Sequence, residues 1–233
     1  MFSYHGSKSK IVDYYPPPKH SKIIEPFAGS ARYALKYYDR DVLLVDKYET
    51  IIKLWKWLQK CEPKDILGLP KLKKGDDIRN ISGLCEEEII LLGYGAQAGV
   101  AKHGNTVTEA GTRVMKTMFK NVASQLHKIK HWEIRQGCYT EIENETATWF
   151  IDPPYQFGGA SYKHSNKKID FEKLAAWCKE RNGQSIVCEN MKADWLNFKP
   201  VKQIQGLAQT NTVEAIWSNQ RTNYDCEQIL LQF

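Results

Sequence analysis

Residues 149 to 155 read Trp-Phe-Ile-Asp-Pro-Pro-Tyr, an apolar run followed by a carboxylate, two prolines and an aromatic ring. Aromatic and β-branched side chains are typical of a central strand, and proline cannot donate to a strand ladder, so this strand must end before Pro153. In open α/β sheets, ligands bind at the carboxyl ends of the strands. Asp152 and Tyr155 are therefore candidates for chemistry, although an Asp-Pro-Pro sequence can equally well do no more than end a strand.

The segment 22–46 predicts a parallel sheet. An apolar strand is followed by a tight loop at Gly29, a helix that begins near Ser30, and a second apolar strand that ends at Asp46. An acidic residue at this distance beyond the loop can accept hydrogen bonds from both hydroxyls of a ribose. The loop lacks the G-x-G-x-x-G pattern of phosphate binders, and the negative charge of Glu25 before it would repel a pyrophosphate. A positively charged cofactor is favoured.

The composition narrows the class of protein. With 233 residues, 42% hydrophobic and 26% charged, the chain suits a soluble globular protein that has one main core and room for an insertion. No apolar run approaches the length that spans a bilayer, and the N-terminus does not resemble a signal peptide, so we expect a cytoplasmic protein that binds no membrane. The six cysteines are scattered without a C-x-x-C pair, which predicts neither disulfides nor a zinc site. A net charge of +6 favours a polyanionic partner.

Residues 61–131 interrupt the strand and helix pattern with prolines, glycines and charges, and indicate an inserted lobe. The flanking segments 1–60 and 132–233 then form the cofactor half and the catalytic half of one domain. The clearest element of the lobe is a predicted helix from about residue 112 to 131, with an apolar face formed by Met115, Met118, Phe119, Val122, Leu126 and Ile129. A second face is basic and carries Arg113, Lys116, Lys120, His127 and His131. Such a face is usually only solvated, but an inserted lobe that also carries Lys102, His103 and Asn105 is consistent with nucleic-acid binding.

Four motifs follow one another along the chain: Tyr4-x-Gly6-x-Lys8, Glu25-Pro-Phe-Ala-Gly29-Ser30, Asp46 and Asp152-Pro-Pro-Tyr155. In this order they resemble the motifs of the Dam-type DNA adenine-N6 methyltransferases, especially small phage members, and the resemblance extends over essentially the whole chain. It implies an α/β fold, namely a Rossmann-like class I methyltransferase sheet with a mainly helical target-recognition lobe inserted before the catalytic motif. The segments Glu214–Ser218 and Glu227–Phe233 resemble the antiparallel strand pair that closes such a sheet.

The resemblance also implies which residues act. The function would be site-specific transfer of a methyl group from S-adenosylmethionine to N6 of an adenine flipped out of double-stranded DNA, by a monomer or weak dimer that uses no metal. The catalytic residues would be Asp152, Pro153, Pro154 and Tyr155. The cofactor would be bound by Tyr4, Gly6, Lys8, Glu25, Phe27, Gly29, Ser30, Ala31, Asp46, Tyr139 and Asp152. The DNA would be contacted by Lys102, His103, Asn105, Arg113, Lys116 and Lys120.

The chemistry of these residues suits the transfer. An exocyclic amine is a weak nucleophile, because its lone pair is delocalised into the ring. The Asp152 carboxylate and the Pro153 carbonyl can accept its two N–H bonds as the amine becomes pyramidal, and Tyr155 can stack on the flipped base. The segment 156–164 contains two glycines and is expected to close over that base.

Two departures from the family pattern leave alternatives open. Cys138 stands where family members commonly have an aspartate that meets the adenine of the cofactor, so either the cofactor binds more weakly or Glu141 or a backbone group takes over this contact. Ala31 replaces the second glycine of the cofactor loop, which is a mild change. The absence of a Pro-Cys pair argues against a cytosine-C5 enzyme, and Asp152 favours adenine over cytosine-N4. An RNA base methyltransferase, or a methyltransferase relic that only binds nucleic acid, stays an alternative.

Overall fold

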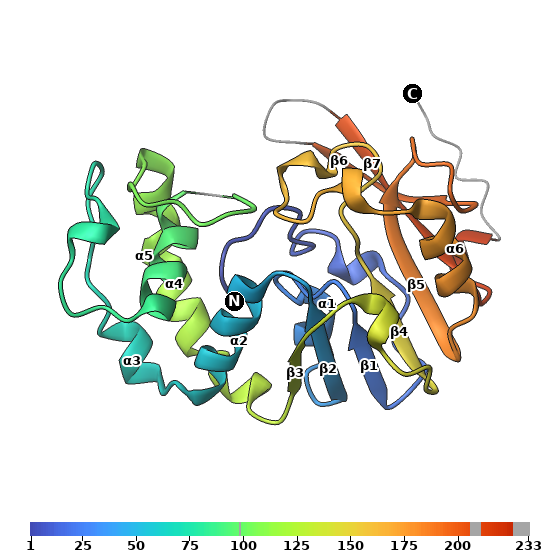
Figure 1. Ribbon diagram of the computed structural model, residues 1–233, viewed down its shortest axis with the longest axis horizontal. Coiled ribbons are helices and arrows are strands. Elements are labelled where there is room, and N and C mark those ends of the chain that lie inside the picture. Colours follow the sequence, from blue (N-terminus) through green and yellow to red (C-terminus); the bar gives the residue numbers. More distant parts are fainter. Residues whose placement is uncertain (98, 206–210, 226–233) are drawn as a thin grey trace.

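The computed structural model describes residues 1–97, 99–205 and 211–225, and these contain a seven-stranded sheet in the order β3-β2-β1-β4-β5-β7-β6 (Figure 1). Strands β1 to β5 run parallel, whereas β7 is antiparallel to both β5 and β6. The predicted Rossmann-like methyltransferase sheet with a C-terminal antiparallel pair is therefore confirmed. The strands are β1 (Lys22–Glu25), β2 (Asp41–Asp46), β3 (Glu133–Gln136), β4 (Ala147–Ile151), β5 (Gly183–Asn190), β6 (Lys199–Gln205) and β7 (Asn211–Ser218).

Helices cover both faces of the sheet, because successive residues of each strand point to opposite sides. In β1, Ile23 packs into the core formed with α1 and α2, whereas Ile24 packs into the core formed with α6. In β4, Phe150 and Ile151 divide between the two cores in the same way. The helices on the sheet are α1 (Arg32–Lys36), α2 (Glu49–Lys60) and α6 (Phe171–Lys179).

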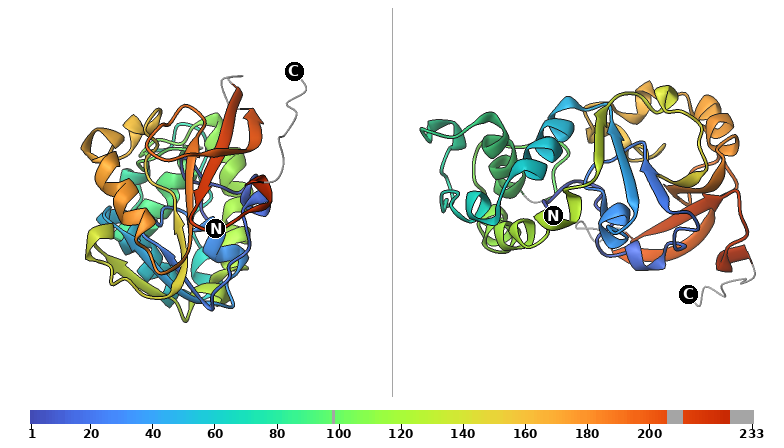
Figure 2. Two further views of the ribbon diagram at one scale, coloured as in Figure 1. Left: turned by 90° about the vertical axis from the view of Figure 1, so that its right-hand side faces the viewer. Right: turned by 90° about the horizontal axis from the view of Figure 1, so that it is seen from below.

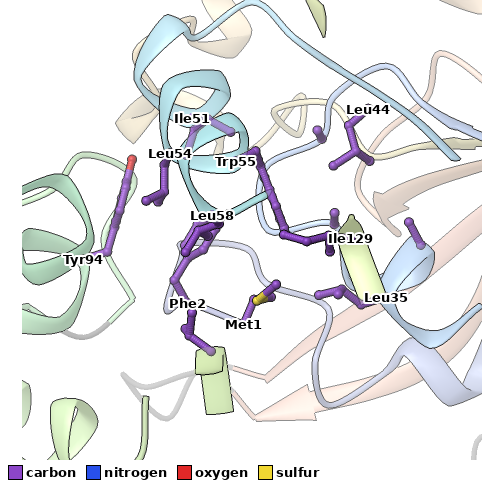
Figure 3. Close-up of a cluster of buried hydrophobic side chains, with 14 of the residues drawn as sticks. Met1, Phe2, Leu35, Leu44, Ile51, Leu54, Trp55, Leu58, Tyr94 and Ile129 are labelled. Carbon is purple, nitrogen blue, oxygen red and sulfur yellow. The ribbon is translucent and has the colours of Figure 1, made fainter. Parts of the chain in front are cut away.

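The residues between α2 and β3 form a helical lobe beside the sheet, not over either face, as the two views of Figure 2 show. Its helices are α3 (Pro63–Leu67), α4 (Glu86–Ala96) and α5 (Glu109–Ala123). The core of the lobe is continuous with the first core of the sheet: the ring of Phe2 lies 5.3 Å from that of Trp55 in α2 and 5.6 Å from that of Tyr94 in α4 (Figure 3). The lobe is thus packed against the segment 1–60 and not joined to it by a linker alone.

The helix expected over residues 112–131 differs at both ends. It begins earlier, where the Thr108 hydroxyl accepts the N–H of Gly111 and caps the first turn of α5. It ends at Ala123, and a separate 3-10 turn, Leu126–Ile129, then leads towards β3. That turn still buries Leu126 and Ile129 beside the apolar face of α5, so the face was predicted correctly and the continuity of the helix was not.

The antiparallel pair at the end of the sheet also differs from expectation. Within the described residues, β7 pairs with β6 and with β5, while the predicted partner segment 227–233 lies outside the described residues. The sequence gives a poor strand signal for β6 because Pro200 lies within it. The strand is at the edge of the sheet and has a register shift between Pro200 and Lys202, which is where a sheet accommodates proline. No helix in the described part of the chain is long and apolar enough to cross a membrane.

Candidate active site

The carboxyl ends of β1, β2 and β4 are neighbours in the sheet, and each is followed or ended by an acidic residue. Glu25 ends β1, Asp46 ends β2, and Asp152 follows β4 directly. All three side chains line one cavity of about 270 Å³ at this edge of the sheet. Ligands of parallel α/β sheets bind at such an edge, and the parallel order explains why three carboxylates distant in sequence meet there.

Every residue predicted to bind the cofactor lines this cavity, namely Tyr4, Gly6, Lys8, Glu25, Phe27, Gly29, Ser30, Ala31, Asp46, Tyr139 and Asp152. Of the predicted catalytic residues, Asp152 and Pro154 line it, while Pro153 and Tyr155 are not among the lining residues. Other lining residues were not named as cofactor or catalytic residues, among them His5, Arg32, Thr140, Tyr162, His164 and Lys168. Tyr162 and His164 belong to the segment 156–164 that was expected to close over the base. Arg32 begins α1, and the others lie in loops or short 3-10 turns without a periodic pattern, so only their place in the fold identifies them.

Backbone N–H groups hold the two carboxylates at the ends of β1 and β2. The Asp46 carboxylate accepts the N–H of Gly29 through Oδ2 at 3.0 Å and that of Tyr48 through Oδ1 at 2.8 Å. The Glu25 carboxylate accepts the N–H of Ala34, in the first turns of α1, at 2.7 Å. Burial raises the pKa of Asp46, and it raises the pKa of Glu25 to about 8. Glu25 is therefore mostly protonated at neutral pH in the protein without ligand. From the sequence this side chain was expected to be negatively charged, and the raised pKa revises that expectation for the free protein.

The loop between β1 and α1 is held in an unusual backbone conformation. Gly29 has a φ of +45°, and a Cβ at this position would lie 3.2 Å from the ring of Tyr4. Ala31 has a φ of 45° as well, although it is not a glycine. The left-handed region costs an L-residue about 1–2 kcal/mol. The replacement of the second loop glycine by Ala31 therefore keeps the loop geometry and adds strain to it.

Asp152 is held by a side chain and not by the backbone. The Lys8 ammonium lies 2.8 Å from Asp152 Oδ1 and 4.0 Å from Glu214 Oε1, and it also donates to the carbonyl of Gly6 at 3.1 Å. Burial raises the pKa of Asp152 to about 6, and the ammonium of Lys8 opposes that rise. Burial alone would lower the pKa of Lys8, but the charges of Asp152 and Glu214 outweigh it and leave the pKa above its ordinary value. Lys8 was predicted to bind the cofactor; it lines the cavity, and its ammonium pairs with Asp152.

Glu214 of β7 is the centre of a second set of contacts that the sequence did not indicate. One of its oxygens, Oε1, accepts the hydroxyl of Tyr155 at 2.5 Å and that of Tyr15 at 2.7 Å. Burial raises the pKa of both tyrosines far above the ordinary value, so both remain donors. The Lys8 ammonium lies 4.7 Å from the centroid of the Tyr155 ring. The position and orientation of Tyr155 are therefore fixed from β7.

Two loops meet above the cavity. The Tyr162 hydroxyl donates to the carbonyl of His5 at 3.2 Å. Gly6, with a φ of +69°, leaves room for this hydroxyl, because a Cβ at Gly6 would lie 2.2 Å from the Tyr162 hydroxyl oxygen. Tyr162, Lys163 and His164 all line the cavity. The segment 156–164 thus contacts the N-terminal loop, and its closure over a base stays a prediction.

Cys138 lines the cavity near Phe27 and Tyr139, whose rings lie 5.4 Å apart. Glu141 was a candidate to replace the missing acidic side chain. Its carboxylate accepts the N–H of Cys138 at 2.9 Å and lies beside Gly137, so Glu141 is exposed next to two residues that line the cavity without being one of them. Whether Glu141, a backbone group or neither replaces the contact of an aspartate stays open.

The residues predicted to contact nucleic acid lie in the lobe. Lys102, Arg113, Lys116 and Lys120 have exposed side chains, and in the part of the chain that the structure describes none of the four forms an ion pair. His103 and Asn105 are only half exposed, and each has a structural contact in the lobe: the His103 ring packs on Tyr94, and the Asn105 carbonyl accepts the N–H of Ile78. Burial lowers the pKa of His103, which makes it a poorer phosphate ligand than the four exposed cations. Among the described residues, no cluster of His, Cys, Asp and Glu side chains is suited to a metal ion.

The sheet order and the cavity at its carboxyl edge define an α/β protein with the Rossmann-like fold of class I methyltransferases. No protein-family model matches the sequence, and no curated protein matches it. Two solved structures resemble the fold. A protein from Escherichia coli described as "putative methyltransferase yhhF" is 9% identical, with 90% of this chain and 78% of that chain covered and a TM-score of 0.36. A protein from Haemophilus influenzae described as "putative methylase HI0767" is 12% identical, with 87% and 81% covered and a TM-score of 0.38. At these identities and TM-scores the two structures do not indicate the function of this chain, and a functional proposal must rest on the residues of the site.

Proposed function

We propose that this protein transfers a methyl group from S-adenosylmethionine to the exocyclic N6 amine of an adenine in double-stranded DNA. The observation that carries the proposal is the contact between Lys8 and Asp152, in which a nitrogen donor lies 2.8 Å from a carboxylate in the cofactor cavity. The site can therefore hold an amine against a buried acceptor, which is what methylation of an exocyclic amine requires.

The residues of the cavity fit the cofactor. At about 270 Å³ the cavity is just below the range for small-molecule sites, about 300–1,000 Å³. Asp46 would accept hydrogen bonds from the ribose, and the rings of Phe27 and Tyr139 would pack on the adenine. Glu25 would face the positive charge of the ligand, which favours ionisation of its carboxyl. The bound cofactor supplies an activated methyl group on a positively charged sulfur.

The residues of the chain then act on the amine. The Asp152 carboxylate and the Pro153 carbonyl accept the two amine N–H bonds, which frees the nitrogen lone pair for attack. As the nitrogen becomes positive, its attraction to Asp152 grows, and this stabilises the transition state more than the ground state. Asp152 must be ionised for this role, and since its pKa is raised to about 6 by burial it is ionised at neutral pH. Tyr155, fixed by Glu214, would stack on the flipped base.

The lobe supports a nucleic-acid substrate. Lys102, Arg113, Lys116 and Lys120 are exposed cations without a counter-ion among the described residues, and the net charge of the chain is +6. Such cations supply affinity for phosphates without reading the sequence of the bases. Double-stranded DNA is the proposed partner; the lobe that carries these cations lies beside the sheet and not over it (Figure 1).

Transfer of isotope from labelled S-adenosylmethionine tests the proposal. Unmethylated double-stranded DNA, RNA and a blank without nucleic acid are compared, and nuclease digestion of the product identifies the modified base. We expect label on N6 of adenine from DNA, and at least about 100-fold slower labelling with an Asp152→Asn variant. Label on RNA alone, or on cytosine, would contradict the assignment of the substrate. Binding of DNA and cofactor without transfer would indicate a protein that has lost catalysis.

A further inference from the structure

Two large apolar side chains are exposed directly beside the catalytic loop. Phe157, two residues after Tyr155, is 51% exposed, and Met191, just beyond the carboxyl end of β5, is 44% exposed. Neither belongs to either of the two apolar cores formed by the described residues. Exposing such side chains has a cost in water, so a pair of them at the edge of a site is a candidate for a contact surface.

The segments that carry this pair are bound to each other. The side-chain amide of Asn190 donates to the carbonyl of Phe157 at 2.9 Å, so the residue before Met191 is bound to the backbone of Phe157. The amide of Asn166 donates to the carbonyl of Gln156 at 2.7 Å. The N–H of Gln156 in turn binds the buried carboxylate of Glu189. The segments that carry Phe157 and Met191 are thus held in place by hydrogen bonds to neighbouring residues.

The surroundings of the pair are basic. Lys167 and Lys168 follow Asn166, and Lys192 follows Met191; all three side chains are exposed, and none forms an ion pair with another described residue. The nearby carboxylates have other partners. Asp194 accepts the side-chain amide of Gln156 at 3.0 Å, and Asp170 pairs with Lys173 at 3.2 Å. An apolar pair flanked by unpaired cations is complementary to a nucleic acid, whose bases are flat and apolar and whose backbone is anionic.

We propose that Phe157 and Met191 form a second nucleic-acid contact, separate from the lobe, which fills the gap left in the stack when the target base leaves it, while Lys167, Lys168 and Lys192 contact the flanking phosphates. The inference rests on the proposed function, because it takes the base that enters the cavity to come from a stacked strand. Extruding a base costs the stacking of that base, and apolar side chains inserted at a base step recover part of this cost. The pair is suitably placed, since it follows the loop that carries Asp152 and would meet the strand where that base departs.

Equilibrium binding to two fluorescent duplexes of the same sequence tests the contact without any need for methyl transfer. One duplex is intact and the other has a central abasic site, which supplies a gap at no unstacking cost. The wild-type protein should prefer the abasic duplex. The F157A/M191A variant should bind that duplex about ten-fold more weakly, the scale for one stacking side chain, and lose the preference. Leu67→Ala is the matched control, because Leu67 is an apolar side chain of α3 that is 55% exposed, and it should change neither affinity.

The outcomes separate this inference from the proposed function. An unchanged preference in F157A/M191A, no preference in the wild-type protein, or no binding of either duplex overturns the contact, whatever the transfer assay gives. If wild-type protein transfers no methyl group but the variant loses its preference for the abasic duplex, the contact stands and the proposed function fails. Melting temperatures are measured beside the affinities, and removal of two exposed side chains should leave them within a few degrees of wild type.

The phosphate part of the contact has its own test. Each of Lys167→Gln, Lys168→Gln and Lys192→Gln should lower the slope of log affinity against log salt by about one, because each releases one counter-ion fewer. Lys173→Gln is the control, since Lys173 is already paired with Asp170. Slopes equal to that of the control would remove these three lysines from the interface.

Discussion

The two ends of the cavity hold their carboxylates by different means. At the cofactor end, Glu25 and Asp46 accept hydrogen bonds from backbone N–H groups: Glu25 from Ala34 in α1, and Asp46 from Gly29 in the loop after β1 and from Tyr48 just after β2. At the catalytic end, Asp152 is held by the ammonium of Lys8, which comes from the N-terminal loop. A backbone N–H donor is fixed by the strand-loop-helix unit to which it belongs. A side-chain donor such as the Lys8 ammonium can move away from its carboxylate.

This difference matches the different tasks of the two ends. A cofactor must find the same acceptors in every cycle, and backbone N–H groups keep Asp46 in place whether a ligand is bound or not. Under the proposed function, a target amine must instead reach Asp152 itself, where the nitrogen of Lys8 already occupies the position of a donor. Exchange of one nitrogen donor for another leaves the buried carboxylate satisfied at each stage, which avoids the cost of an unpaired buried charge.

The largest effect is expected at the catalytic end. Asp152→Asn should lower single-turnover methylation by about 100-fold or more, because it removes a charge that stabilises the transition state. Cofactor affinity should change far less, since Asp46 lies on another strand. The substitution leaves Lys8 without its nearest counter-charge, and an unpaired buried ammonium can destabilise the fold. The K8M/D152N variant removes both charges, so its turnover can be measured without that loss of stability. A folded Asp152→Asn protein with near-wild-type turnover would place the active site in another loop.

At the cofactor end, Asp46→Ala should weaken binding of S-adenosylmethionine about ten-fold or more through the loss of charge-assisted hydrogen bonds to the ribose. Calorimetric titration measures it. Asp41→Ala is the matched control, because Asp41 is an exposed acid at the other end of β2. If Asp46→Ala and Asp41→Ala bind the cofactor alike, Asp46 only organises the loop through Gly29 and Tyr48.

The same two ends show what could be predicted from sequence. The strands β1, β2 and β4 were predictable because each is an apolar run that stops at a carboxylate, and parallel order alone then brings Glu25, Asp46 and Asp152 to one edge. The contacts that hold Asp152 and Tyr155 were not predictable. Lys8 lies on a loop without periodicity, and Glu214 points into the site from a strand whose neighbour β6 is obscured by a proline. Contacts made across the sheet by side chains leave no local pattern in a sequence, whereas the backbone contacts of Asp46 belong to a recognisable loop.

The pH dependence of cofactor binding sharpens the comparison. Burial raises the pKa of Glu25 to about 8, so the free carboxyl is largely neutral at pH 7. A positively charged ligand favours the ionised form and lowers this pKa, so affinity should rise as the pH rises from 6 and level off above 8. Asp152 and Lys8 also act on Glu25, but Lys8 stays charged and Asp152 is ionised above pH 6. Glu25→Gln should keep the contact with Ala34 and abolish the rise. A wild-type affinity that does not depend on pH over this range would contradict the role of Glu25.

The lobe offers a third kind of contact, with a smaller effect for each residue. Arg113→Gln, Lys116→Gln and Lys120→Gln should each reduce the slope of log DNA affinity against log salt by about one, whatever the DNA sequence. Lys179→Gln, on the exposed side of α6, is the control. If the lobe variants and the control give the same slope as wild type, the basic face of α5 is only solvated.

The smallest effect concerns the strained loop at the cofactor end. Ala31→Gly relieves a left-handed backbone worth about 1–2 kcal/mol, but it also removes a buried methyl group worth about 0.8 kcal/mol and adds about 0.4–1 kcal/mol of unfolded-state entropy, so the free energy of unfolding should change by less than about 1 kcal/mol. Ala34→Gly is the matched control, because Ala34 is a buried alanine three residues further on with helical geometry, and it should cost about 2 kcal/mol from lost helix propensity and lost burial. Urea unfolding of both variants measures the difference. Equal losses of unfolding free energy in the two variants would mean that the backbone of Ala31 is not strained in solution. The loop at the cofactor end would then be held only by its hydrogen bonds to Glu25 and Asp46.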